Sequence, residues 1–360
     1  VWGAVSGAGG AGGVLLGGVL TQAWGWPWVF HSVAFGAALV LVAVVALVPS
    51  SDGAGAGREA AEPRSGRRAE RFDLLGAATI TLAFTLLVWA LTTARSAGWT
   101  DAGVLVALAG SAVLLAAFVV IELRRPNALV PPRLFTTGRV AAGNVLMALL
   151  GSVWIALFFF LPLYQQQVLG MGPLSTGAGQ LPLAVANMAG AAVAPRIARL
   201  LGPTATVTAA LATEAAGLLW LSRISADGSY AADVLGPSVL VGLGLSIAFV
   251  GLTALAVDGV PPQDAGLAGG LVNTTRQVGG AVGLAALATL AGSVTARAAE
   301  RQPHLEALTA GYRAAFGVSA AVIGATALLA LFLTAPRTTT PRTTTPRPTT
   351  PRTPAERLLP

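Results

Sequence analysis

The hydrophobic residues of this chain come in long blocks that short polar stretches separate. Most blocks contain about 20 residues, the length at which an α-helix crosses ~30 Å of hydrocarbon. The pattern therefore predicts an all-α, polytopic membrane protein with about ten spanning helices. The predicted helices cover residues 1–20, 28–48, 72–93, 102–121, 140–164, 176–195, 204–222, 234–255, 266–294 and 311–334.

The composition supports this prediction. Hydrophobic residues make up 54% of the chain, charged residues 10%, and the mean hydropathy is +0.73, which is too apolar for a water-soluble globule. There is no cysteine, so disulfides, thiolate metal sites and a cysteine nucleophile are excluded. His31 and His304 are too far apart to suggest a metal pair, and no cluster of Ser, His and Asp indicates catalysis. We therefore expect no enzyme activity, no metal and no cofactor.

The positive charge follows the predicted topology. A net charge of +7 and an isoelectric point near 11.2 could indicate a nucleic-acid partner, but the arginines alternate with the helices. One set of loops holds Arg58, Arg64, Arg67, Arg68, Arg71, Arg124, Arg125, Arg133, Arg139, Arg196 and Arg199, and the tail adds Arg337, Arg342, Arg347, Arg352 and Arg357. The opposite set holds Arg95, Arg223, Arg297 and Arg301. By the positive-inside rule, both chain ends lie on the cytoplasmic side of the cell membrane, and no nucleic acid is expected as a partner.

A glycine-rich stretch opens the chain, and it has two interpretations. Gly7, Gly9 and Gly12 have the spacing of the dinucleotide fingerprint G-x-G-x-x-G, which needs a preceding strand and an acidic residue ~20 positions later. Neither is present, since the first acidic residue is Asp52. Alternatively, Gly9, Gly13 and Gly17 lie on one helix face and, with Gly18, allow close approach of a neighbouring helix. The second interpretation fits a membrane span.

The spacing Gly9-x-x-x-Gly13-Val-x-x-Gly17-Gly18 resembles the antiporter motif G-x-x-x-G-P-x-x-G-G in the fifth helix of the major facilitator superfamily. Four further stretches resemble motifs of one branch, the drug:proton antiporter family with fourteen spanning helices (EmrB/QacA type). They are Trp26-Pro-Trp-Val-Phe30, Arg71-Phe-Asp-Leu-Leu-Gly76, Phe158 to Gly170 with Leu-Pro-Leu-Tyr-Gln inside it, and Gly266 to Gly283 with Asn273-Thr-Thr-Arg276-Gln277 inside it. The chain departs from the motifs at several places: Val14 replaces a kink proline, Pro27 replaces an arginine, positions 33 and 35 lack the expected Asn and Pro, and the turn Gly202-Pro203-Thr lacks an arginine.

The resemblance implies a division of the chain. Residues 1–49 are the last two helices of an N-terminal half, 72–121 an inserted helix pair, and 140–334 a complete C-terminal six-helix half. Residues 50–71 are a cytoplasmic linker, 122–139 a cytoplasmic loop, and 335–360 a disordered tail rich in Arg, Thr and Pro. On this plan the first four helices of the family are absent, so we expect an N-terminally truncated chain.

The resemblance also implies a function. The family exports drugs in exchange for protons by alternating access at the interface of two halves, so the expected partners are the lipid bilayer, protons and amphipathic or cationic drugs or metabolites. A full-length protein is expected to be a monomer, and this chain alone is not expected to complete the transport cycle. The alternative is a protein that does not transport, either a truncated relic or a helical module for a separate partner.

Polar residues inside the predicted helices are the candidates for the transport pathway. Glu214 is the clearest, because a charge at mid-membrane costs at least ~2.5 kcal/mol and so marks a functional hypothesis. It carries a proton or binds a cation on one interpretation, and on the other it snorkels or makes a structural hydrogen bond. Asn187 and Asn144 are single amides that suit either an interhelical hydrogen bond or a cavity contact.

The remaining candidates lie on two helices. Asn273 and Gln277 share a face with Gly266, Gly270 and Gly280, and are expected to shape the cavity. Arg276, roughly 15 Å inside its helix by rise, either lines a cytoplasm-facing gate or pairs with a carboxylate such as Asp258 or Asp264. Phe159 and Tyr164, with neighbouring phenylalanines, could stack on a flat drug or pack against lipid and core.

Overall fold

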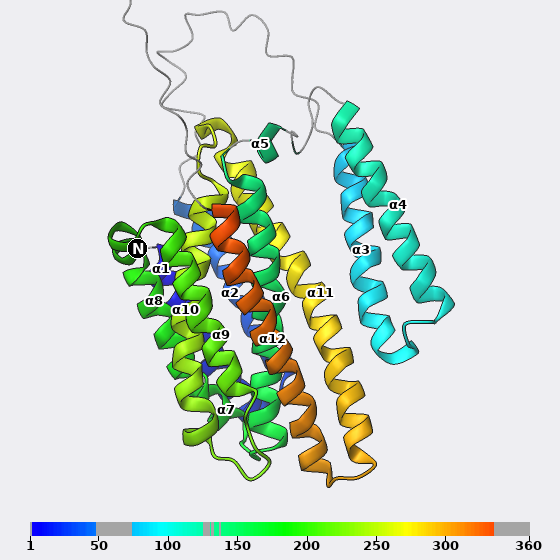
Figure 1. The fold of residues 1–360 in the computed structure, drawn as a ribbon, viewed down its shortest axis with the longest axis vertical. Helices are drawn as coiled ribbons and strands as arrows, with labels where there is room; N and C mark the ends of the chain where they lie inside the picture. The colour runs from blue at the N-terminus through cyan, green and yellow to red at the C-terminus, as the bar shows by residue number, and fades with distance from the viewer. Residues whose placement is uncertain (1, 48–73, 125–129, 131–132, 137, 335–360) are drawn as a thin grey trace, which may run out of the picture.

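The structure, a computed structural model, describes residues 2–47, 74–124, 130, 133–136 and 138–334. Within these ranges every regular element is helical (Figure 1). The elements are α1 (Trp2–Trp24), α2 (Pro27–Leu47), α3 (Leu74–Ala97), α4 (Ala102–Arg124), α5 (Arg133–Thr136), α6 (Val140–Gln167), α7 (Pro173–Gly179), α8 (Leu181–Leu201), α9 (Pro203–Leu221), η1 (Tyr230–Leu235), α10 (Gly236–Ala256), η2 (Pro262–Asp264), α11 (Ala265–Ala299) and α12 (His304–Thr334). The linker 50–71 and the tail 335–360 lie outside the described residues.

Each of the ten predicted blocks forms a helix. In the described part of the chain, nine helical segments are long and apolar enough to cross a membrane, and α7 with α8 and η1 with α10 each count as one span. The glycine-rich α1 is the tenth helix and is not among the nine. The largest differences are at the α7–α8 segment, α11 and α12, each of which extends five to seven residues beyond one end of its predicted block. The prediction of an all-α, multi-pass membrane protein is confirmed.

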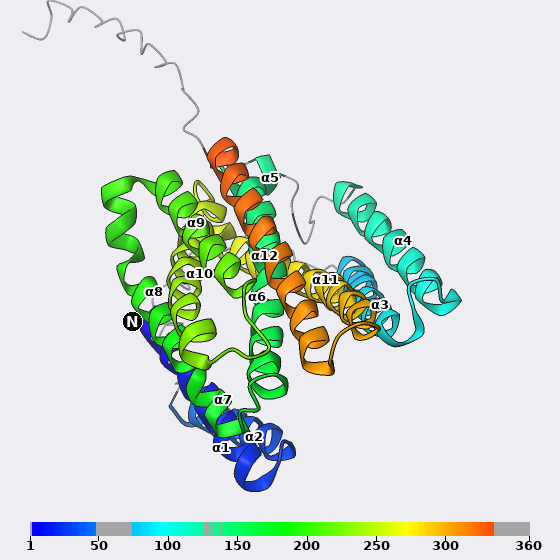
Figure 2. The same cartoon turned by 60° about the horizontal axis from the view of Figure 1, so that its bottom comes forward.

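Six long helices, α6 and α8 to α12, form the main bundle. The closest neighbours are α6 with α11, α10 with both α8 and α9, and α12 with both α9 and α11. Figures 1 and 2 show these helices side by side, with the short α7 at one end and α5 at the other. The bundle and the short elements between its helices span residues 140–334.

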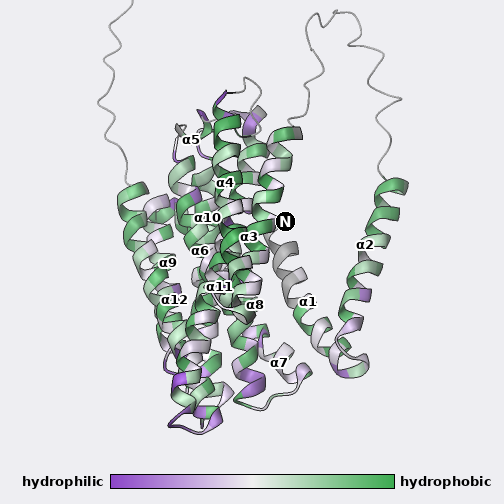
Figure 3. Cartoon of the chain, turned by 90° about the vertical axis from the view of Figure 1, so that its right-hand side faces the viewer, coloured by the Kyte–Doolittle hydropathy of each residue, from purple (hydrophilic) through white to green (hydrophobic). Residues whose placement is uncertain are grey.

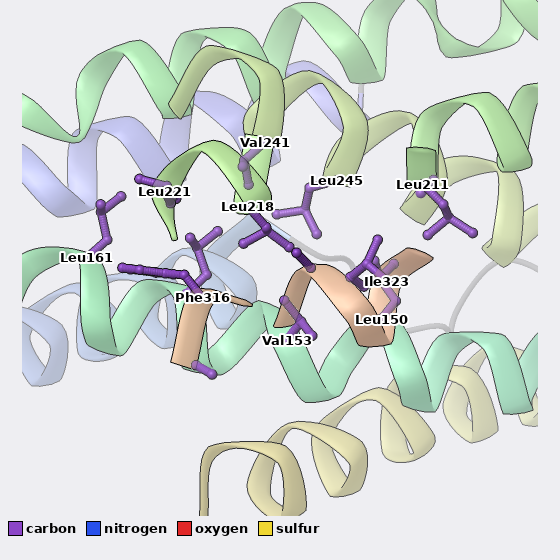
Figure 4. Packing of buried hydrophobic residues seen from close by; sticks show 14 of the residues in the cluster. Leu150, Val153, Leu161, Leu211, Leu218, Leu221, Val241, Leu245, Phe316 and Ile323 are labelled. Carbon is purple, nitrogen blue, oxygen red and sulfur yellow. The ribbon is translucent and has the colours of Figure 1, made fainter. Parts of the chain in front are cut away.

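Branched and aromatic side chains from all six long helices form the core of the bundle. Figure 4 shows Leu150 and Val153 of α6 meeting Leu211 and Leu218 of α9, with Phe316 of α12 beside them, and all five are buried. Lipid tails are as apolar as these side chains, so their burial gives little hydrophobic driving force in a bilayer. Close van der Waals packing must hold the helices together instead.

The α6–α11 contact illustrates this packing. A β-carbon added at Gly283 of α11 would lie 2.5 Å from both Cα and Cβ of Ser152 in α6, and one at Gly279 would lie 2.9 Å from Cα of Ala148. On the α6 side, a β-carbon at Gly151 would lie 3.0 Å from Cα of Arg276. Small residues on both helices therefore bring the two backbones into contact, as in other membrane helix pairs.

The remaining long helices lie outside the bundle. α3 and α4 pack against each other, and α3 also contacts α11 of the bundle. In the turn between α3 and α4, Trp99 Nε1 donates a hydrogen bond to Thr289 Oγ1 of α11 at 3.1 Å. α2 has no buried residue and stands beside α1 at the edge of the molecule (Figure 3). Apolar residues run along these helices and polar residues gather at the helix ends, which suits surfaces covered by lipid.

The packing of α1 differs from the prediction. Gly18 is buried, and a β-carbon there would lie 2.9 Å from Pro173 O and 3.6 Å from Gly177 Cα of α7. By contrast, Gly9, Gly13 and Gly17 have no neighbouring atom within 4 Å of such a β-carbon. The reason is rotational: Gly18 lies about 100° around the helix from Gly17. In the described residues, the face that includes Gly18 therefore makes the crossing, and the Gly9–Gly13–Gly17 face does not.

Candidate functional site

A polar face on α11 brings three of the predicted site residues together. Asn273, Arg276 and Gln277 lie within little more than one turn, and the side chains of Asn273 and Gln277 are exposed. Arg276 donates from a guanidinium NH2 to Asn273 Oδ1 at 2.9 Å. Gly266 and Gly270 continue this exposed face, with no neighbour within 4 Å of an added β-carbon, whereas Gly280 is buried against Ile155 of α6.

The guanidinium of Arg276 also lies over an aromatic ring. Its Cζ is 5.1 Å from the ring centroid of Trp154, a distance at which the negative face of an indole attracts a cation. Trp154 lies midway along the 28-residue α6, so the pair sits at the middle of that span. The Trp154 ring in turn meets Phe249 of α10 at 5.2 Å, nearly perpendicular to it. Three helices thus contribute to one aromatic and cationic cluster.

The prediction that Arg276 pairs with a carboxylate, Asp258 or Asp264, is wrong for this structure. Asp264 instead lies 3.4 Å from an NH2 of Arg133, at the beginning of α5. Within the described residues, Asn273 is the hydrogen-bond partner of Arg276, and no carboxylate is within ion-pair distance of its guanidinium. Asp264 is too far away to reach Arg276, because it precedes Arg276 by twelve residues and the helical rise separates the two by about 18 Å along the axis.

The amides of Asn144 and Asn187 have different surroundings. Thr275 Oγ1 of α11 donates to Asn144 Oδ1 of α6 at 3.0 Å, which confirms an interhelical hydrogen bond for Asn144. Asn187 is partly buried on α8, where its backbone packs on α10: a β-carbon at Gly242 would lie 3.2 Å from Asn187 N. Within the described residues, no hydrogen bond joins Asn187 to Asn273 or Arg276.

Glu214 lies fully inside the bundle. Its residue exposure is 0%, and neither carboxyl oxygen has a hydrogen-bond partner in the described structure. The snorkelling interpretation is therefore wrong here, since the side chain does not reach a surface. A buried carboxyl without a hydrogen-bond partner is costly, so its position here marks Glu214 as a candidate for function.

Helix α10 separates Glu214 from the polar face. Gly244 and Gly251 of α10 face α9, and a β-carbon at Gly244 would lie 2.5 Å from Glu214 N. Phe249 projects about 140° around α10 from Gly244, toward Trp154 and hence toward Arg276. The acidic candidate and the basic candidate are thus on different sides of one helix rather than in one cavity.

The two aromatic candidates on α6 differ in exposure. Phe159 is partly exposed and meets Phe160 at 5.2 Å with the rings nearly perpendicular. Tyr164 is 0% exposed, and its hydroxyl lies 2.8 Å from Ser225 O and 2.9 Å from Asp233 Oδ2. The prediction that Tyr164 stacks on a drug is therefore wrong for this conformation, because the ring is enclosed. Its hydroxyl instead makes hydrogen bonds to the segment that connects α9 to η1 and to η1 itself.

The sequence interpretation missed Trp154 and Asp233. Trp154 had a visible signal, because it is a tryptophan at the middle of a predicted span rather than near the ends, where membrane tryptophans concentrate. Asp233 had none, because its partner Tyr164 is distant in sequence.

The fold and the polar face define a polytopic helical membrane protein of the transporter class. The sequence model of the Major Facilitator Superfamily matches residues 1–284, and the chain belongs to this superfamily. It is therefore classed with membrane transporters and not with enzymes.

Several curated relatives match most of the chain. It is 39% identical over 298 residues to a cephamycin export protein, CmcT, of Amycolatopsis lactamdurans, covering 81% of this chain and 58% of the relative. It is 34% identical over 294 residues to a tetracenomycin C resistance and export protein of Streptomyces glaucescens, covering 81% and 52%. A puromycin resistance protein of Streptomyces alboniger is 33% identical over 342 residues, covering 92% and 65%. The chain thus spans between half and two thirds of the length of these relatives.

Proposed function

We propose that this chain is part of a proton-coupled exporter of amphipathic antibiotics or metabolites, of the drug:proton antiporter type with fourteen spanning helices. It acts in the cell membrane with both chain ends in the cytoplasm. The observation that carries the proposal is the polar face around Asn273, Arg276 and Gln277, in the first half of α11, on a bundle of the major facilitator superfamily. Relatives of similar sequence are named for the export of cephamycin and of tetracenomycin C.

The arrangement of helices supports the fourteen-helix type. A six-helix half at 140–334 and two preceding helices, α1 and α2, follow the general plan of the superfamily. The pair α3 and α4 packs mainly on itself and touches the bundle through α11, as a pair inserted between two halves would do. In this plan α1 belongs to the N-terminal half, and its contact with α7 and α8 is part of the interface between the halves.

Glu214 supports proton coupling. A carboxyl that is buried without a partner holds a proton in this conformation, and it releases that proton when a change in helix packing admits water. Because α10 contacts both Glu214 and the Trp154–Arg276 pair through opposite sides, a movement of α10 affects both. Proton binding and substrate binding are then coupled through this helix, with Asn187 on α8 packed against it.

A second candidate is that the chain does not transport by itself. Alternating access needs two halves that rock against each other around the substrate site, and in the described residues one six-helix bundle is present. We therefore expect the 360-residue chain to insert into membranes without exporting dye. Export by the chain alone would contradict this expectation, and the presence of four more in-frame spans upstream of the Val1 codon would support it.

The test of the main proposal is transport by the complete gene product. Everted membrane vesicles that contain the protein are energised with a proton gradient, and the uptake of ethidium, rhodamine 123 or fluorescein into them is measured. These dyes differ in charge. We expect at least one dye to accumulate, and we expect Glu214→Gln to abolish accumulation while the protein level is unchanged. Glu306→Gln, at the exposed beginning of α12, is the matched control. Full transport by the Glu214→Gln variant would overturn the role of Glu214, and absence of transport of every dye by the wild type would overturn export.

A further inference from the structure

Arg276 has binding capacity that the described chain does not use. Its guanidinium makes one hydrogen bond, to Asn273, and rests on the ring of Trp154. A guanidinium has five N–H donors in a planar fork that matches a carboxylate with two parallel hydrogen bonds. Beside the ring of Trp154 at the middle of α6 and the exposed amides of Asn273 and Gln277, the unused donors point to a ligand that supplies acceptors.

The charge around the polar face of Asn273, Arg276 and Gln277 is positive. The helices α6, α8, α10 and α11 contain no aspartate or glutamate along their whole lengths. Glu214, the acidic residue in the middle of α9, lies behind α10 and is fully enclosed. The four helices therefore offer Arg276 no counter-ion of their own at mid-span, and they offer a cationic ligand no carboxylate.

We infer that this face selects amphipathic organic anions, in particular ring compounds that carry a carboxylate, over cations. The inference rests on the proposed export function and names its substrate class. The carboxylate binds the free donors of Arg276, and the ring of the ligand lies along the apolar and aromatic surface beside them. It replaces the broader expectation of amphipathic or cationic substrates.

The aromatic ring that a cation would use is already occupied. Trp154 has Arg276 over its face at 5.1 Å and Phe249 against it at 5.2 Å. A cationic ligand would have to displace the guanidinium from the indole and would then remain close to a like charge, in a setting where water screens little. An anion needs no such displacement, since it binds the free donors of Arg276, which is partly exposed.

The test uses two dyes that share a xanthene ring system and differ in charge. Fluorescein is an anion with a free carboxylate, and rhodamine 123 is a cation whose carboxylate is a methyl ester. Binding of each to the purified chain in lipid nanodiscs is measured by fluorescence anisotropy. We expect saturable binding of fluorescein that is at least tenfold tighter than that of rhodamine 123, and we expect Arg276→Gln to weaken fluorescein binding at least tenfold without weakening rhodamine 123 binding.

Two further variants guard against loss of folding. Arg276→Lys keeps the charge and loses the planar fork, so we expect intermediate affinity for fluorescein. Arg297→Gln, an exposed arginine near the end of the same helix, should bind like the wild type; all variants are checked by size-exclusion chromatography. Equal binding of both dyes, preference for rhodamine 123, absence of saturable binding or unchanged fluorescein binding in Arg276→Gln would each overturn the inference. Vesicle transport of rhodamine 123 alone would do so while leaving the export proposal intact.

Discussion

Gly244 of α10 sits directly on the backbone of Glu214 in α9: a β-carbon at Gly244 would lie 2.5 Å from Glu214 N and 2.6 Å from Ala210 O. The buried carboxyl and the closest approach of two helices therefore coincide. The site that would bind the proton is built into the α9–α10 contact, and its surroundings depend on how closely these helices pack. This relationship leads to the first two predictions.

Gly244→Ala is expected to lower the free energy of unfolding by about 1–3 kcal/mol, because an added methyl group in a packed interior forces the backbones apart. The measurement is thermal unfolding in detergent, followed by circular dichroism. The matched control is Gly324→Ala in α12, where nothing lies within 4 Å of an added β-carbon. An unchanged melting temperature for Gly244→Ala would show that α9 and α10 are farther apart than described.

Glu214→Leu is expected to raise the free energy of unfolding by about 1–3 kcal/mol, the range of the penalty for a buried polar group without a partner. The same variant should lose proton-coupled export, since stability and function conflict at such sites. Unfolding in detergent gives the first quantity and vesicle dye transport the second. Glu300→Leu, at the exposed end of α11, is the control. A destabilised Glu214→Leu variant would indicate that the carboxyl makes a structural bond instead.

Tyr164→Phe is expected to cost about 1 kcal/mol of stability, the usual net value of one hydrogen bond. The hydroxyl contacts Ser225 O and Asp233 Oδ2, and Asp233 Oδ2 also accepts from Ser225 N at 3.2 Å. A double-mutant cycle with Asp233→Asn measures the link between the two side chains, and the coupling free energy should exceed about 0.5 kcal/mol. Strictly additive effects would mean that Tyr164 and Asp233 do not interact.

The number and approximate limits of the helices could be predicted because membrane spans have a fixed minimum length and a high apolar content. The position of Glu214 inside an apolar block could be predicted as well, but the sequence left open whether its carboxyl is buried or snorkels to a surface, and the packing of α9 against α10 decides this. The packing partners could not be predicted. The rotation of α1 that places Gly18 and not Gly17 at the crossing depends on where α7 lies, and nothing in the α1 sequence records that.

The surroundings of Arg276 show the same limit. Its depth in the helix followed from counting residues, but its contact with Trp154 depends on the register between α6 and α11. That register is set by glycines of α11 that meet Gly151, Ser152 and Ala148 of α6. A single sequence shows the glycines and not which residues they face.

Gly283→Ala tests the register between α6 and α11. An added methyl group would lie 2.5 Å from both Cα and Cβ of Ser152, so the helices must separate or slide, and we expect a loss of about 1–3 kcal/mol of stability. Gly292→Ala, on the same helix with no neighbour within 4 Å, should be neutral or slightly stabilising, because alanine favours a helix over glycine.

The register itself can be read by cross-linking, because the chain has no cysteine of its own. Asn144 and Thr275 are joined by a hydrogen bond of 3.0 Å across the two helices, so cysteines at these positions should form a disulfide under mild oxidation. Gly283→Ala should slow that reaction, whereas Gly292→Ala should leave it unchanged. Rapid cross-linking in both variants would mean that the Gly283–Ser152 contact does not set the register, and the position of Arg276 over Trp154 would need another cause.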